Sequence, residues 1–218
     1  ATDGFVGQYD HGTSRSLIVE PHTINDDEYA WVTQGLDLVF PDAHFHERLS
    51  DTIDPKVDFR RRRAYGEQFR SYVERWGLLS RGVSATVPEQ LLTADLDVVA
   101  AWLKSVFQAD GYVSHRDKTA QIGIATEAEH FIKGIQTLLS RFGIFSRVSS
   151  QEDYRTNRHT RWVLSIMNHG DRELFAQHIG FISDDKQTKL LESLGISDRS
   201  ANDTKTLQVK SIVSRGVM

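Results

Sequence analysis

Hydrophobic and polar positions in the N-terminal part of the chain predict two strands, a helix, two further strands and a second helix. Residues 5–9 and 16–20 have extended character and flank a turn. Asn25 is a candidate helix N-cap, apolar positions then keep helical spacing, and Pro41 ends that helix. The remaining predicted elements are strands at 44–49 and 57–65 and an amphipathic helix at 68–76.

The same order of elements is predicted a second time further along the chain. Ile179-Gly180-Phe181 follows the last short helix of this second series, as Trp76-Gly77-Leu78 follows that of the first. This repetition predicts a duplicated unit with four strands in each half. The predicted elements are strands at 112–115 and 119–125, a helix at 127–141, strands at 144–149 and 160–166, and helices at 171–178 and 185–194.

A short motif is repeated at the start of both units. Residues 1–6 (A-T-D-G-F-V) correspond to residues 108–113 (Q-A-D-G-Y-V), which places one aspartate at an equivalent point of each half, Asp3 and Asp110. Two equivalent carboxylates in a pseudo-symmetric molecule suit a substrate that is itself nearly two-fold symmetric. Duplex DNA is the commonest such substrate.

The helix predicted before the second copy has one face of small side chains. It is capped by residues 93–95 and spans 96–109, with Ala101, Ser105 and Ala109 four residues apart. Such a face allows another helix to approach closely. If the same helix preceded the first copy, the pair would bring both aspartates together. The sequence begins where that helix should end, so we expect it to be a segment of a longer protein.

Residues 102–113 (W-L-K-S-V-F-Q-A-D-G-Y-V) resemble the LAGLIDADG motif of homing endonucleases, and residues 1–6 resemble the end of a first copy. The passage 139–147, and Ile179-Gly180-Phe181 with a lysine shortly after it, extend the resemblance over nearly the whole chain. Two further segments are similar to intein-borne members of the family: 82–92, with its Val-Pro pair, and 207–218.

The resemblance implies an α+β saddle of two αββαββα halves. Their antiparallel sheets would face DNA, and the two motif helices would form a central seam. On this basis residues 1–92 are the first half, with its motif helix upstream, and residues 93–200 are the second. Residues 201–218 resemble the strand by which an intein chain returns to its splicing domain.

The resemblance also implies the residues of the active sites. Asp3 and Asp110 would bind divalent metal, and Mg²⁺ held by carboxylates can orient water and neutralise charge in phosphodiester hydrolysis. The backbone carbonyls of Thr2 and Ala109 would help. A lone Asp-Gly pair would instead be an ordinary helix end, but a duplicated pair on a small-residue seam favours the metal role.

Basic residues of the two active sites are predicted in the same way. Lys186 matches the basic residue of the second site, although a solvated lysine opening a helix is the alternative. In the first half, Ser84-Ala85-Thr86 stands where a lysine is usual, which leaves Arg81 as the nearest basic candidate and puts one of the two cuts in doubt.

Four consecutive arginines lie on a predicted strand although the net charge is −4, and phosphate binding needs such clusters. Side chains alternate along a strand, so Arg60 and Arg62 face one way and Arg61 and Arg63 the other. One pair could contact DNA while the other is solvated or paired with acid; protection of an edge strand is the alternative. Further DNA-binding candidates are Arg15, His115, Arg116, Lys118, Arg147, Arg155, Arg158 and Arg161.

The amino-acid composition restricts the class of protein but does not indicate a function. The hydrophobic share of 39% and the charged share of 26% are ordinary for a globular protein, and Trp31, Trp76, Trp102 and Trp162 are expected in the core. No apolar run approaches the roughly 18 residues of a membrane helix. The absence of cysteine excludes disulfides and thiolate metal sites and fits a cytoplasmic protein.

These observations predict a monomeric, magnesium-dependent endonuclease domain of an intein that cuts both strands of a long, asymmetric duplex site. Its partners would be double-stranded DNA and the host precursor with its exteins. Ala1 is not a splicing nucleophile and the chain lacks a terminal His-Asn pair, so splicing is not assigned to these residues. The alternative is a cleavage-impaired nucleic-acid-binding relative, maturase-like or regulator-like, which Ala85 and the acidic net charge favour. A carboxylate-pair glycosidase would explain neither the basic strands nor the helix seam.

Overall fold

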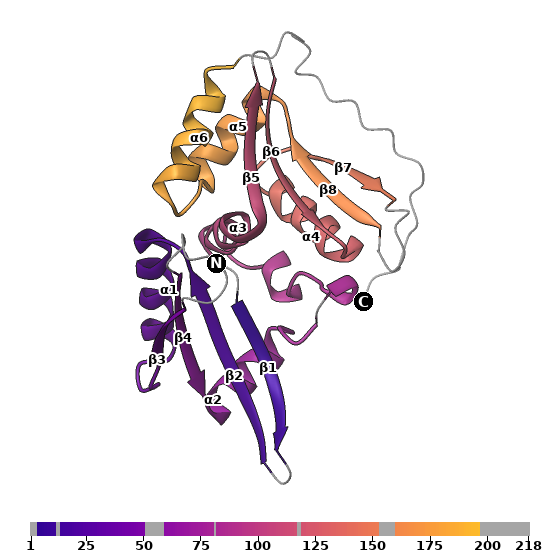
Figure 1. Ribbon diagram of the computed structural model, residues 1–218. Helices are drawn as coiled ribbons and strands as arrows, with labels where there is room; N and C mark the ends of the chain where they lie inside the picture. The colour runs from indigo at the N-terminus through magenta and orange to yellow at the C-terminus, as the bar shows by residue number, and fades with distance from the viewer. Residues whose placement is uncertain are drawn as a thin grey trace, which may run out of the picture.

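The computed structural model describes residues 4–11, 14–50, 59–80, 82–116, 119–152 and 160–196 (Figure 1). These residues form two four-stranded antiparallel sheets with the strand orders β1-β2-β4-β3 and β5-β6-β8-β7. The second order is the first one repeated four strands later, which confirms the predicted α+β class and the duplicated unit. Predicted segments 1–3 and 201–218 lie outside the described residues.

The elements of the first half agree with the predicted order. Asn25 caps the first helix, because its side-chain oxygen accepts the backbone N–H of Glu28 at 2.8 Å, and the helix ends two residues before Pro41. The elements are β1 (Gly4–His11), β2 (Ser14–Thr23), α1 (Asp26–Val39), β3 (His46–Ser50), β4 (Phe59–Tyr65) and α2 (Glu67–Arg75).

The second half has the same order after two short 3-10 helices, η1 (Gly82–Ser84) and η2 (Glu89–Leu92). Asp95 occupies the N-cap position of the long helix as predicted, but its side chain makes no capping hydrogen bond. The elements are α3 (Leu96–Asp110), β5 (Gly111–Arg116), β6 (Thr119–Thr126), α4 (Glu129–Ser140), β7 (Arg147–Gln151), β8 (Arg161–Ile166), α5 (His169–His178) and α6 (Asp184–Leu194).

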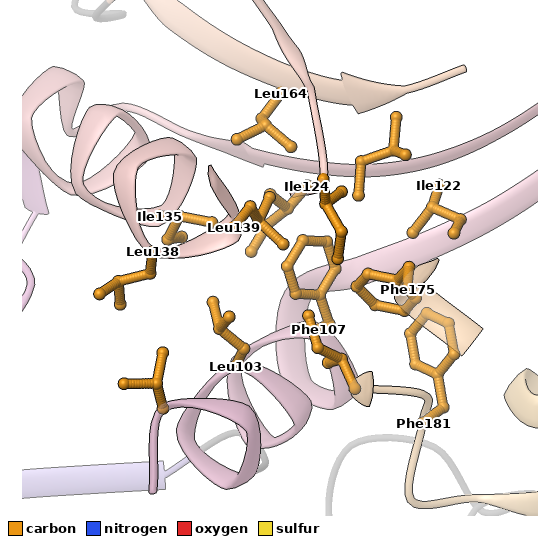
Figure 2. Close-up of a cluster of buried hydrophobic side chains, with 14 of the residues drawn as sticks. Leu103, Phe107, Ile122, Ile124, Ile135, Leu138, Leu139, Leu164, Phe175 and Phe181 are labelled. Atoms are coloured by element: carbon orange, nitrogen blue, oxygen red, sulfur yellow. The ribbon is translucent and has the colours of Figure 1, made fainter. Parts of the chain in front are cut away.

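The larger core lies in the second half, between its sheet and its helices (Figure 2). Leu103 and Phe107 project from α3 into this core and are fully buried. The ring of Phe107 meets that of Phe175 edge-on, with centroids 4.9 Å apart. The first half has a smaller buried cluster formed by Leu17, Ala64, Phe69 and Val73. Thus α3 is anchored by its packing in the second half.

None of the helices in the described ranges combines the length and the apolar character needed to cross a lipid bilayer.

Candidate active site and nucleic-acid interface

The chain passes directly from α3 into β5 at Asp110 and Gly111. A Cβ atom on Gly111 would lie 2.5 Å from the carbonyl oxygen of Phe107 and 2.8 Å from its ring. Only glycine therefore fits this close approach, although its φ of −79° is open to any residue. The tight transition holds Asp110 at the exposed C-terminal end of α3 while Phe107 stays in the core.

Lys186 reaches the same end of α3 from the first turn of α6. Its Nζ donates to the carbonyl oxygens of Gln108 at 2.6 Å and Gly111 at 2.8 Å. A positive charge at a helix C-terminus is stabilised by the helix dipole and by the unpaired carbonyls. The ammonium group is thus held by the backbone carbonyls of two residues that flank Asp110 in the sequence. The structure therefore brings together Lys186 and Asp110, two residues predicted from sequence to share a site.

Of the other predicted active-site residues, the structure describes only Ala109. Ala109 is half-buried in the last turn of α3, while Asp3, Thr2 and Arg81 lie outside the described residues. Among the described residues no group of three or more His, Asp or Glu side chains could hold a metal. The end of α3 still presents carboxylate and main-chain oxygens, which are the donor types that Mg²⁺ prefers. This donor set fits a cation that would share Asp110 with a second carboxylate.

Arg60 and Arg62 lie on the face of the first sheet that carries the helices. Ala64, two residues further along β4, is fully buried in the cluster with Phe69 of α2. Arg60 contacts the carboxylate of Asp26 at 2.5 Å, and its guanidinium lies 4.7 Å from the centroid of the Tyr29 ring. Arg62 is paired with two carboxylates, at 3.5 Å from Asp37 and 3.6 Å from Glu47. These two arginines are therefore paired with acid on the helix-bearing face.

Arg61 and Arg63 lie on the opposite, helix-free face, beside Glu20 and His22 of β2. Glu20 is only 4% exposed and accepts a hydrogen bond from Arg63, while Arg61 lies 3.8 Å away and the His22 ring nitrogen 2.9 Å away. Burial alone would raise the pKa of Glu20, but the hydrogen bonds with Arg63 and His22 outweigh it and lower the pKa. The same hydrogen bond raises the pKa of Arg63. The buried carboxylate thus holds the cations of the helix-free face in place.

Basic residues of the second half also lie on its helix-free face. Arg147 is opposite Ser165, and Arg161 is opposite Gln151, whereas the alternating Leu164 and Ile166 enter the core. Arg116 falls on the helix-free face by the same alternation, since it pairs with Thr119 while Val113 pairs with the buried Ile122. All three arginines are exposed: Arg116, Arg147 and Arg161.

His115 departs from the predicted DNA-contact set. It alternates with Arg116 and points to the helix-bearing side, where its ring nitrogen lies 3.5 Å from Glu192 of α6. The remaining candidates are not placed: Lys118, Arg155 and Arg158 lie outside the described residues. The backbone of Arg15 is paired with Asp10, but its side chain lies outside what the structure describes.

A large apolar groove separates α3 from the helices of the first half. Its volume is about 1010 Å³, and Ala101 and Ser105 of the predicted small-residue face line one wall. Trp31, which we expected in the core, lies 36% exposed in this groove and donates its indole N–H to Ser105 at 3.2 Å. Other lining residues are Val6, Val19, Val32, Gly35, Val39, Phe40, Phe69, Tyr72, Val73, Leu78 and Trp102.

Three residues important for this geometry were not singled out from the sequence: Glu28, Gln108 and Ser183. Gln108 and Glu28 are both 3% exposed and are joined by a hydrogen bond of 2.6 Å across 80 residues of sequence. Ser183 is the N-cap of α6 and accepts the backbone N–H of Lys186 at 3.4 Å. The serine followed by two aspartates was an available capping signal. Nothing in the neighbouring sequence indicated the roles of Glu28 and Gln108.

Comparisons with known proteins give one family match and several relatives. Residues 97–180 match the model of a LAGLIDADG-like domain. The chain is 37% identical over 116 residues to glutamine–fructose-6-phosphate aminotransferase of Methanocaldococcus jannaschii, a match that covers 52% of this chain and 10% of that protein. It is 33% identical over 117 residues to the probable translation initiation factor IF-2 of Thermococcus kodakarensis, covering 54% and 9%. The chain thus spans about a tenth of the length of these relatives.

Solved structures of homing endonucleases share the arrangement of most of the chain. I-DmoI in complex with DNA and Mn superposes with a TM-score of 0.56 at 16% identity, covering 81% of this chain and 89% of that one. I-DmoI in complex with DNA and Ca gives a TM-score of 0.59 at 15% identity, covering 87% and 91%. The chain has the fold of these LAGLIDADG structures, and the match to the LAGLIDADG-like domain model is limited to its residues 97–180.

Proposed function

We propose that this chain is a metal-dependent, site-specific DNA endonuclease that hydrolyses both strands of a long duplex site. The observation that carries the proposal is the meeting of Lys186 with the Asp110–Gly111 end of α3. A carboxylate and an ammonium group at one exposed point suit phosphodiester cleavage, where the carboxylate binds a cation and the ammonium stabilises negative charge. The LAGLIDADG fold and the DNA-bound I-DmoI structures support it.

The helix-free faces of the two sheets are the proposed DNA-binding surface. Arg61 and Arg63 in the first half, and Arg116, Arg147 and Arg161 in the second, would contact phosphates or base edges. Arg60, Arg62 and His115 are left out because their side chains lie on the helix-bearing side. This division explains how a chain with a net charge of −4 can offer a basic surface, since much of its acid is on the helices.

We propose Mg²⁺ as the physiological metal, held at the second site by Asp110 with the backbone carbonyl of Ala109 and completed by Asp3. When bound, the cation supplies an activated water and neutralises charge on the phosphoryl oxygens. The chain's own contribution is to hold Asp110 at the end of α3 through the close packing of Gly111. Lys186 contributes a fixed positive charge beside the scissile phosphate.

We further propose that the chain is the endonuclease portion of an intein, that residues 1–92 and 93–200 are its two halves, and that it acts as a monomer in the cytoplasm. Its partners would be the DNA target and the host precursor. Support comes from the relatives. One is an aminotransferase and the other a translation factor, so the two have different activities, and each is matched over only about a tenth of its length. A segment inserted into unrelated hosts accounts for this pattern. The splicing chemistry itself is not assigned to these residues.

The groove beside α3 is the proposed seat of a second motif helix. By the internal symmetry of the fold, a counterpart of α3 would lie against the first sheet, where Ala101 and Ser105 allow a close helix crossing. A synthetic peptide with the sequence of residues 96–110 tests the groove. It should raise the melting temperature of the chain, and an Ala101→Trp variant, whose ring would fill the groove, should not respond. No stabilisation of the unmodified chain would contradict this role.

The function is tested by exposing genomic DNA and a plasmid library to the purified chain, with and without Mg²⁺, and sequencing the ends. The nuclease proposal requires cuts that recur at one long sequence, need the metal and leave short 3′ overhangs. The acidic net charge favours a second candidate, a non-cleaving nucleic-acid-binding relative. It would shift the mobility of DNA or RNA yet leave every plasmid supercoiled.

A further inference from the structure

A buried polar bridge joins the two halves of the chain next to the candidate active site. Glu28 lies in the first turn of α1, Gln108 lies near the end of α3, and both side chains are 3% exposed. The amide nitrogen of Gln108 donates to the carboxylate of Glu28 at 2.6 Å and to the hydroxyl of Ser183 at 3.1 Å. Its amide oxygen accepts the backbone N–H groups of Ile182 and Ser183 at 3.0 and 3.1 Å.

Together with one further contact, these bonds give every polar atom of both side chains a partner. The second carboxylate oxygen of Glu28 accepts the backbone N–H of Ile24 at 3.0 Å. Gln108 donates twice and accepts twice, so its amide can be seated in one orientation only. A buried polar group that loses its partner costs the full desolvation of that group, which makes this arrangement specific as well as stable. The nitrogen of Gln108 must face Glu28.

The bridge ends at Lys186, whose ammonium group reaches the Asp110–Gly111 end of α3. The backbone carbonyl of Gln108 accepts the ammonium group of Lys186, and Ser183 caps the helix that presents Lys186. Gln108 therefore contacts the start of α6 through its amide nitrogen, its amide oxygen and its backbone carbonyl. A second link, from the backbone N–H of Asp184 to the carboxylate of Asp27 at 3.3 Å, joins the same two helix ends.

We propose that Glu28 and Gln108 are positioning residues for DNA cleavage at the Asp110 site. Their hydrogen bond fixes the start of α6, and this places the ammonium group of Lys186 beside Asp110. The first half thereby takes part in the chemistry at the end of α3 through Glu28, in addition to contacting DNA. This inference rests on the proposed nuclease function.

A reciprocal exchange of the two side chains tests the proposal. Gln108→Glu sets two carboxylates against each other, and Glu28→Gln turns an amide N–H toward either the Ile24 N–H or the Gln108 amide nitrogen. In the double variant, the new amide at 28 can donate to the new carboxylate at 108 while its oxygen accepts from Ile24. The carboxylate at 108 can accept from the hydroxyl of Ser183 and from the backbone N–H groups of Ile182 and Ser183, so every contact is restored, with only the bonds to residue 28 and to the Ser183 hydroxyl reversed in direction.

The measurements are the single-turnover rate of cutting on an identified target, the dissociation constant for that DNA, and the far-UV circular dichroism of each variant. We expect Gln108→Glu to cut at least about tenfold more slowly, because an increase of about 1.4 kcal/mol in the activation free energy lowers the rate tenfold. The DNA affinity of this variant should change less than about threefold. The double variant should recover to within about threefold of the unmodified rate. Exchange at two exposed positions, Glu127→Gln with Gln177→Glu, is the charge-matched control and should leave the rate unchanged.

Two outcomes would overturn the inference. One is a double variant as slow as Gln108→Glu, and the other is a single variant that cuts at the unmodified rate while folded. Failure of the unmodified chain to cut any DNA would instead remove the nuclease proposal on which the inference rests. In that case, a double-mutant cycle on the free energy of unfolding still measures whether Glu28 and Gln108 are coupled.

Discussion

The guanidinium group of Arg63 is hydrogen-bonded to the carboxylate of Glu20, which is 4% exposed although it lies on the helix-free face of its sheet. His22 and Arg61 approach the same carboxylate. One buried acid thus organises three basic side chains on the surface that we assign to DNA binding. The arrangement links the stability of the sheet to its charge.

Acid should destabilise the chain through Glu20. Because the folded-state pKa of Glu20 is lowered, its stabilising effect is complete above its unfolded pKa of about 4.3 and is lost as pH falls through the folded value. The unfolded state binds the proton more readily, so stability must rise with pH in this window. Urea unfolding at several pH values below 5 checks this, and Glu20→Gln should flatten the dependence there. An unchanged slope in that variant would mean the ion pair is not made in solution.

Neutralising Arg61 and Arg63 together should weaken DNA binding and reduce its salt dependence. Each lost phosphate contact lowers the slope of log K against log salt by roughly 0.9. The matched control is the neutralised pair Arg60 and Arg62, which should leave the slope unchanged because both are held by acids on the helix-bearing side. Equal slopes for the two double variants would place the DNA elsewhere.

Asp110→Asn should abolish cutting of one strand while preserving binding. The amide keeps the size of the side chain but removes the charge that would hold the cation, and we expect the cutting rate of that strand to fall at least about 100-fold. A supercoiled plasmid with the target would then accumulate as nicked circles. Linear product formed at the normal rate would exclude a metal role for Asp110.

Gly111→Ala should destabilise the fold by about 1–3 kcal/mol, the cost of overpacking a closely packed site. The added Cβ would meet the backbone oxygen of Phe107, which cannot rotate away. Gly77 offers a comparison, because nothing lies within 4 Å of its Cβ position, although its φ of 63° adds its own strain. Denaturant unfolding of both variants measures the difference. A Gly111→Ala chain as stable as the unmodified one would show that the α3–β5 junction can relax.

Local pattern was sufficient to predict the elements and the duplication. The apolar spacing after Asn25 and the Pro41 stop define α1, and the repeated Asp-Gly motif located the end of α3. Alternation also divided the four arginines correctly into two pairs. It could not decide which pair lies under the helices, because that depends on which face of the sheet buries Ala64 and Leu17.

Contacts between residues distant in the sequence could not be predicted from local patterns. Glu28 and Gln108 are ordinary polar residues until folding brings them together. Trp31 was expected in a core because large aromatic side chains are usually buried, yet it lines the groove. Its position depends on the space between α1 and α3, and no periodicity within α1 describes that space.

The two flanks of α3 serve different neighbours: Leu103 and Phe107 fill the core of one half, while Ala101 and Ser105 border the groove toward the other. A substitution on this helix must therefore fit both the core on one side and the groove on the other. Few side chains meet both requirements. Outward strand positions that do not contact the buried Glu20, such as Arg116, Arg147 and Arg161, carry no such double constraint. For the proposed nuclease, retargeting to a new DNA sequence should accordingly succeed by altering these strand residues alone, with the residues at the end of α3 left intact.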